Sequence, residues 1–106
     1  MGTPEAYLQK AWGDSVDNPT IQDVRNAISE TIKMDDEHGA FWVGIADKDE
    51  TVLETYKDLS VIGIFPGIAE QQIKSRFYNW KEIEDLYNVF LAGDFDAVKA
   101  TLVANG

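Results

Sequence analysis

The chain has 106 residues, which leaves room for one domain with a hydrophobic core and none for a second domain. It contains no cysteine, which excludes disulfide bonds, thiolate metal sites and a cysteine nucleophile. Its 19 acidic and 9 basic residues give a formal net charge of -10. Because this charge repels phosphate backbones and attracts cations and basic proteins, it disfavours nucleic-acid binding.

The first residues lack the basic start and the apolar stretch of a signal peptide. No apolar run approaches the roughly 20 residues that are needed to cross a bilayer. We therefore expect a soluble cytoplasmic protein with no membrane partner.

The N-terminal segment predicts a short helix. Thr3 and Pro4 are residue types preferred at the N-cap and at the first helical position. The apolar residues that then recur at helical spacing are Leu8, Ala11 and Trp12. Gly13 is expected to end this helix, and residues 14–17 are expected to form a polar connection.

Asn18 and Pro19 open the clearest helical pattern, which ends near Lys33. Its apolar stripe consists of Ile21, Val24, Ile28 and Ile32. The opposite side is polar, as expected for a helix that packs with one face on a sheet. An acidic stretch with the only histidine, residues 34–39, follows it.

Three short apolar runs in the middle of the chain, at 40–46, 51–57 and 60–65, predict strands. They are rich in β-branched and aromatic residues and too short for typical helices. The polar connections between them are so short that they join only antiparallel neighbours. The sequence therefore predicts an antiparallel meander.

Alternation along these strands assigns their side chains to two faces. In the first strand the expected core face carries Phe41, Val43 and Ile45. In the second strand the mixed row that we expect to be only partly covered is Val52, Glu54 and Tyr56. The third strand is apolar on both faces, so we expect it in the centre of the sheet and covered on both sides.

Residues 72–78 are open to two interpretations. As a strand they place Ile73, Ser75 and Phe77 inward, whereas a helix would align Ala69, Ile73 and Phe77. We favour the strand, which would be the fourth.

Two helices are predicted after residue 78. Asn79 is the expected cap of the first, and Gly93 ends it. Its apolar face consists of Trp80, Ile83, Leu86, Tyr87, Phe90 and Leu91. Asp94 is the expected cap of the last helix, whose apolar residues are Phe95, Val98 and Leu102.

The predicted fold is a single α+β domain over residues 1–106. Its centre is a three- to four-stranded antiparallel meander sheet, flanked by N-terminal and C-terminal helices.

The sequence offers little for catalysis. It has one histidine and no G-x-S-x-G elbow, which disfavours a serine nucleophile. Adjacent ligands such as Asp35, Asp36, Glu37 and His38 rarely converge on one metal ion. A calcium loop at Asp47 and Asp49 would need a glycine where Val52 stands. Any two carboxylates that meet in space remain an open possibility for acid-base work, but the sequence singles out no pair. We therefore expect no catalytic residue, no metal and no cofactor.

One stretch resembles a known family. From Asn18 to Gly67 the chain shows Asn18-Pro19-Thr20, then Val24, Ala27 and Ile28, then a polar break, a strand ending in Gly44-Ile45 and a second hairpin. This order resembles small immunity proteins of bacterial polymorphic toxin systems. The resemblance covers about half of the chain. It implies a cytoplasmic protein without catalysis that binds and blocks a cognate toxin domain, and it transfers no contact residues.

Two functions follow as hypotheses. The first is a protein-binding module whose acidic surface meets a basic partner. Its candidate residues, of which we favour the 47–50 hairpin with the two aromatics, are Asp47, Asp49, Glu50, Trp42, Tyr56, Asp35, Asp36 and Glu37. The alternative is a small-ligand-binding or enzymatic domain with a pocket between sheet and helices, lined by Trp42, Tyr56 or Tyr87. The acidic charge also has a simpler interpretation, as a means of solubility.

Overall fold

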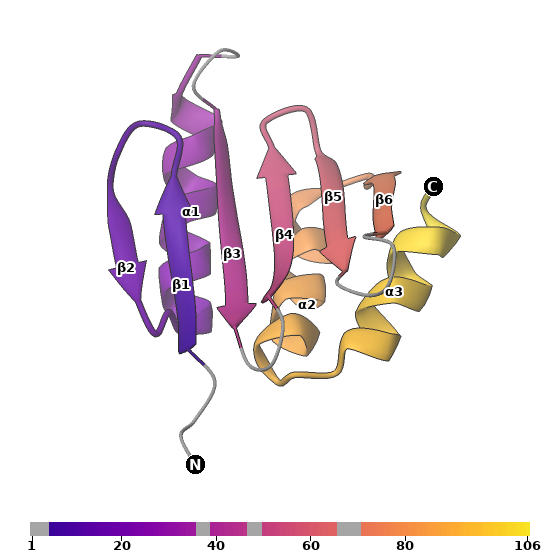
Figure 1. Ribbon diagram of the computed structural model, residues 1–106. Coiled ribbons are helices and arrows are strands. Elements are labelled where there is room, and N and C mark those ends of the chain that lie inside the picture. Colours follow the sequence, from indigo (N-terminus) through magenta and orange to yellow (C-terminus); the bar gives the residue numbers. More distant parts are fainter. Residues whose placement is uncertain (1–4, 36–38, 47–49, 66–70) are drawn as a thin grey trace.

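Figure 1 shows the computed structural model, which describes residues 5–35, 39–46, 50–65 and 71–106. The fold is α+β with an antiparallel sheet, as predicted, but the sheet has six strands rather than three or four. In chain order the elements are β1 (Glu5–Lys10), β2 (Ser15–Asp17), α1 (Ile21–Lys33), β3 (Ala40–Ala46), β4 (Glu50–Tyr56), β5 (Ser60–Phe65), β6 (Gln71–Arg76), α2 (Trp80–Leu91) and α3 (Phe95–Ala104).

The strands lie in the order β2-β1-β3-β4-β5-β6, with all neighbours antiparallel. The meander of β3, β4 and β5 is confirmed, and β4 starts one residue earlier than predicted. The strand interpretation of 72–78 is also correct, because β6 pairs with β5 and buries Ser75.

The predicted N-terminal helix is wrong, because the described residues there form β1. Leu8 pairs with Val43 and is fully buried, while Tyr7 on the other face pairs with Gly44. The apolar repeat covered barely one helical turn, and pairing with β3 outweighs it. The expected polar connection at 14–17 contains the strand β2, which pairs with β1.

The prediction of β5 as a central, doubly covered strand is also wrong, because β5 lies next to the edge strand β6. Val61 and Phe65 are buried on one face of the sheet. Ile62 and Ile64 on the other face are partly exposed. The centre of the sheet is β3 and β4, where Phe41, Val43, Ile45 and Leu53 form the predicted core face.

Helix α1 begins after the N-cap Thr20, which forms a capping box with Asp23. Its buried residues are Val24, Ala27, Ile28 and Thr31. The predicted stripe is therefore wrong at its C-terminal end, where Ile32 is 46% exposed. Beside the helix, Lys10 of β1 donates to both carboxylate oxygens of Glu30, at 3.1 and 2.7 Å, and so ties the N-terminal strand to α1.

The C-terminal helices begin as predicted, after the caps Asn79 and Asp94. Ile83, Leu86 and Phe90 are buried, also as predicted. In the view of Figure 1, α1 and α2 lie behind the sheet and α3 lies at its right side, against β5 and β6. Hence the core lies between one face of the sheet and this helical layer.

The two edges of the sheet are short or occupied. Strand β2 has only three residues. At the other edge, the backbone N–H of Arg76 in β6 donates to the carbonyl of Asn105 at 3.0 Å, so the C-terminal residues bond to this edge.

Candidate functional site

The face of the sheet that carries no described helix is the strongest candidate for a functional surface, and it faces the viewer in Figure 1. We call it the open face. The strand register places alternate side chains on it. Its larger side chains are Tyr7, Gln9, Trp42, Glu50, Val52, Glu54, Tyr56, Ile62, Ile64, Gln72, Lys74 and Arg76.

Tyr7 lies flat on this face, over Gly44 of the neighbouring strand. A Cβ atom at Gly44 would lie only 2.4 Å from Cζ of the Tyr7 ring, so the ring occupies the space above the glycine. The Tyr7 hydroxyl donates to Oε2 of Glu50 at 3.1 Å. Burial, followed by this hydrogen bond, raises the pKa of Tyr7.

A second tyrosine-carboxylate pair lies on β4. The hydroxyl of Tyr56 donates to Oε1 of Glu54 at 2.9 Å. Burial and this hydrogen bond raise the pKa of Tyr56 to about 12. Trp42 and Ile62 are the cross-strand partners of Glu54 on either side. The Glu54 carboxylate is therefore flanked by an aromatic side chain on one neighbouring strand and an aliphatic side chain on the other.

The composition of the open face suits contact with another macromolecule. Tyrosine and tryptophan combine a large apolar ring with a polar group, and they are enriched at protein interfaces. The carboxylates of Glu50 and Glu54 lie on β4, and the exposed basic side chains of the face, Lys74 and Arg76, lie on β6. No group of three metal-ligating side chains occurs in the described part of the chain.

The structure places three of the predicted partner-binding residues, Trp42, Tyr56 and Glu50, on one face of the sheet, with Glu50 and Tyr56 at opposite ends of β4. Asp35 follows the C-terminal end of α1 and is exposed. Its backbone lies beside Gly39, just before β3 begins, whereas Glu50 is paired with Ala46 at the other end of β3, as expected for segments at the two ends of one strand. Asp36, Glu37, Asp47 and Asp49 are outside the described residues.

Tyr7 and Glu54 were not among the predicted site residues. Tyr7 was assigned to a helix, although the alternation of Ala6 and Leu8 with Tyr7 and Gln9 also fits a strand. Glu54 was placed on the correct face, but nothing in the sequence pairs it with Tyr56.

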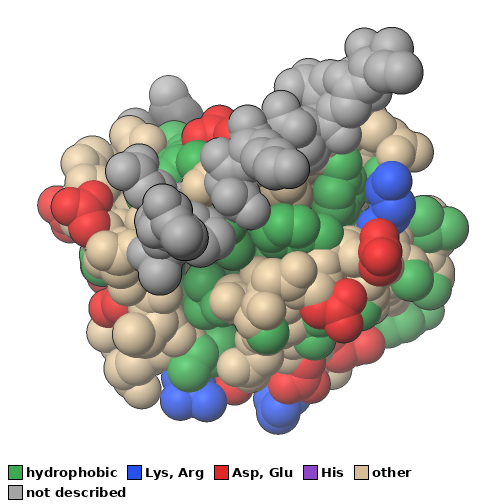
Figure 2. All heavy atoms as spheres, turned by 60° about the horizontal axis from the view of Figure 1, so that its bottom comes forward, with side chains coloured by type: hydrophobic (Ala, Val, Ile, Leu, Met, Phe, Trp, Pro, Cys, Tyr) green, Lys and Arg blue, Asp and Glu red, His purple; other side chains and the backbone are tan. Residues whose placement is uncertain are grey.

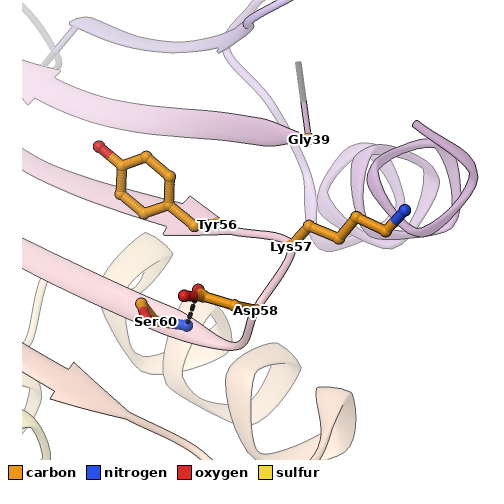
Figure 3. Close-up of a pocket in the computed structure, with 5 residues that line it drawn as sticks. All are labelled: Gly39, Tyr56, Lys57, Asp58 and Ser60. Carbon is orange, nitrogen blue, oxygen red and sulfur yellow. Dashed lines mark hydrogen bonds between the residues drawn. The ribbon is translucent and has the colours of Figure 1, made fainter. Parts of the chain in front are cut away.

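A hollow of about 470 Å³ at one end of the open face is lined by Gly39, Tyr56, Lys57, Asp58 and Ser60. Figure 3 shows Tyr56 and Lys57 pointing in opposite directions from the strand end. The Lys57 ammonium donates to the carbonyl of Met34, and Asp58 accepts the Ser60 N–H at 3.0 Å. Hydrogen bonding from Ser60 lowers the pKa of Asp58. Both charged groups thus stabilise the protein's own loops.

A second hollow of about 400 Å³ lies at the other end of the sheet, between the start of α1 and the end of α2, and is lined by Ala6, Asn18, Pro19, Ile45, Leu91, Ala92 and Gly93. Figure 2 views the molecule from this end and shows hydrophobic side chains among acidic ones. Among the described residues, its lining contains no ionisable side chain.

The predicted pocket between sheet and helices does not include Tyr87. This side chain is fully buried in the core and packs on Phe41, with ring centroids 5.4 Å apart. Trp42 and Tyr56 lie on the opposite face of the sheet from Tyr87, so the three aromatics do not line one cavity.

No described helix is both long and apolar enough to cross a membrane. Comparisons of the chain with protein-family models, with curated proteins and with solved structures find no match.

Proposed function

We propose that this protein is a non-catalytic binding module that acts in the cytoplasm as an immunity protein and blocks a basic toxin domain through its open face. One observation carries the proposal: Tyr7, Trp42 and Tyr56 lie beside the carboxylates of Glu50 and Glu54 on a sheet face without a described helix. The resemblance of residues 18–67 to immunity proteins agrees with this function.

The aromatic side chains supply the anchors that such an interface needs. Interface hot spots are enriched in tryptophan and tyrosine and lie near the centre of the contact. Trp42 and Tyr56 project from β3 and β4, the two central strands. Two hydrogen bonds to carboxylates hold the tyrosines in place, so little side-chain entropy is lost when a partner binds.

Charge selects the class of partner. With a formal net charge of -10, a second copy of the chain and a nucleic acid are both repelled at a distance. A basic protein is attracted, and complementary charge raises its rate of association. The lysine and arginine on β6 lie at the margin of the face and leave the acidic centre free for this contact.

The test begins with a photo-crosslinking amino acid at Gln9 on the open face, in the cells that express the protein. The same amino acid at Asn26, which is exposed on α1, is the matched control. The partner crosslinked at Gln9 is then purified and titrated against the wild type and the double variant Trp42→Ala/Tyr56→Ala.

We expect crosslinking at Gln9 and not at Asn26, and at least a tenfold weaker affinity of the double variant, which is about 1.4 kcal/mol. We also expect the affinity to fall as salt is added, and the partner's toxic activity to stop on binding. Equal crosslinking at both positions, an unchanged affinity, or turnover of a small substrate by the purified protein would overturn the proposal.

A further inference from the structure

The carboxylate of Glu54 is the group on the open face that is best placed to meet a cation. It lies on a central strand and is partly buried. Its Oε1 accepts a hydrogen bond from the Tyr56 hydroxyl. In the described ranges no lysine or arginine forms an ion pair with Glu54, and Lys74, the basic residue of the same row, lies two strands away.

Trp42 provides an aromatic surface next to this carboxylate. The two residues are directly opposite each other on β3 and β4, and such pairs have Cβ atoms about 4.5–5.5 Å apart. A cation that bonds to the Glu54 carboxylate can therefore also approach the Trp42 ring, and cation–π attraction acts within roughly 6 Å of the ring centroid. Cation–π contacts of this kind occur elsewhere in the described chain, where Lys10 lies over the Trp12 ring and Lys99 over the Phe65 ring.

We propose that Glu54, Trp42 and Tyr56 form a receptor for an arginine side chain, which the partner presents to the open face. This inference rests on the proposed function and names the chemistry of its central contact. A planar guanidinium donates to a carboxylate and stacks on an indole at the same time, whereas a lysine ammonium is a compact, strongly hydrated charge that does not stack. The hydrogen bond from Tyr56 holds Oε1 and leaves Oε2 to accept from the guanidinium.

Glu54 is a better receptor than Glu50 because of its surroundings. Glu50 is exposed at the start of β4, where water screens its interaction with a partner charge. Glu54 lies between Trp42 and Ile62, where a bound guanidinium is largely removed from water and a charge-assisted hydrogen bond is stronger.

The test uses the full chain labelled with ¹⁵N and three small probes: N-acetyl-arginine amide, N-acetyl-lysine amide and N-acetyl-citrulline amide. Citrulline has the shape of arginine without its charge. We expect saturable shifts with arginine in the millimolar range, confined to the Trp42 indole N–H and the backbone amides around Glu54 and Tyr56. Lysine should bind more weakly, and citrulline should cause no such shifts.

Two variants address the receptor itself. Glu54→Gln keeps the shape of the side chain and should weaken arginine binding at least tenfold. Trp42→Leu should reduce the preference for arginine over lysine, and it keeps the proposal testable if Glu54→Gln does not fold. Glu84→Gln, on the helix side of the molecule, is the matched control and should bind arginine like the wild type. Shifts that are spread over many acidic residues, or that persist in Glu54→Gln, would overturn the receptor.

The same variants separate this inference from the proposed function. If the purified partner loses affinity for Trp42→Ala/Tyr56→Ala but binds Glu54→Gln like the wild type, the assignment of the open face to the partner is supported and the arginine receptor is excluded. If the arginine probe shifts the Trp42 indole N–H signal but neither Trp42→Ala/Tyr56→Ala nor Glu54→Gln changes the affinity for the partner, the arginine receptor is supported. The assignment of the open face to the partner is then excluded.

Discussion

The hydroxyl groups of Tyr87 and Thr55 lie 2.6 Å apart in the core, where both side chains are fully buried. The Tyr87 hydroxyl also donates to the carbonyl of Leu53 at 3.0 Å, so the Thr55 hydroxyl is the donor in the shared hydrogen bond. This pair connects α2 to the central strand β4, and burial raises the pKa of Tyr87.

Tyr87→Phe should therefore destabilise the protein by about 1–3 kcal/mol, because it leaves the buried Thr55 hydroxyl without its acceptor and removes the bond to the Leu53 carbonyl. Thr55→Val should also destabilise it, and the double variant should lose less than the sum of the two. Urea unfolding of the four proteins measures this coupling. Additive losses would show that the two hydroxyls do not act as a pair.

Thr31→Val should have the opposite effect. Thr31 in α1 is fully buried, and its hydroxyl has no hydrogen-bond partner among the residues that the structure describes. Valine has nearly the same shape without the unpaired group, so we expect a gain of about 1 kcal/mol in the free energy of unfolding. Thr55→Val, which removes a paired hydroxyl, is the control in the same urea experiment. A loss of stability in Thr31→Val would show that the hydroxyl is satisfied.

Gly44→Ala should destabilise the protein by about 1–3 kcal/mol, because the new methyl group overlaps the Tyr7 ring. In the Tyr7→Ala background the ring is gone, and the same substitution should be neutral or stabilising, since alanine suits a strand interior better than glycine. Thermal unfolding of the four proteins measures this change of sign. The same loss in both backgrounds would place the cause elsewhere.

The pKa of about 12 for Tyr56 predicts an alkaline loss of stability. The ordinary pKa of tyrosine is about 10 in the unfolded chain, so between these values the folded protein keeps a proton that the unfolded chain has released. The contribution is complete below pH 10 and falls as the pH rises from about 10 to about 12.

The stability difference between the wild type and Tyr56→Phe, measured by urea unfolding at a series of pH values, should shrink over this window. The absorbance of tyrosinate at high pH gives the titration of the ring directly. Because Tyr56 is 37% exposed, solvent screens the effect and we predict its direction only. A constant difference from pH 8 to pH 12 would contradict the assignment.

Local patterns were sufficient for the elements from residue 40 onward. Strict alternation over seven residues predicts β3, and the cap residues Asn79 and Asp94 predict the starts of α2 and α3. The first strand is different, because its partner β3 is separated from it by about thirty residues. In the folded protein the Tyr7 ring of β1 packs over Gly44 of β3. No local sequence pattern indicates this contact.

The error in the predicted position of β5 is relevant to the candidate site. A strand with apolar residues on both faces indicates either a doubly covered strand or one with a face that binds a partner. Ile62 and Ile64 satisfy the pattern by lying on the open face, beside Val52 and Glu54. Trp42 and Tyr56 could be predicted for the site because alternation fixes their face, whereas Glu50 was predicted as part of the connecting loop and lies instead at the start of β4. The bonds of Tyr7 and Tyr56 to carboxylates depend on rotamers that a sequence does not show.

The two sheet edges have a consequence for how the molecule meets other chains. Exposed edge strands are templates on which further strands can assemble, and proteins guard against this with short strands, edge lysines and covering segments. Here β2 offers three residues, β6 carries Lys74, and the backbone of Arg76 is already bonded to Asn105. Growth of the sheet by strand addition, and with it fibril formation from the folded state, is thereby disfavoured. A partner protein is therefore expected to bind to the open face of the sheet and not to one of its edges.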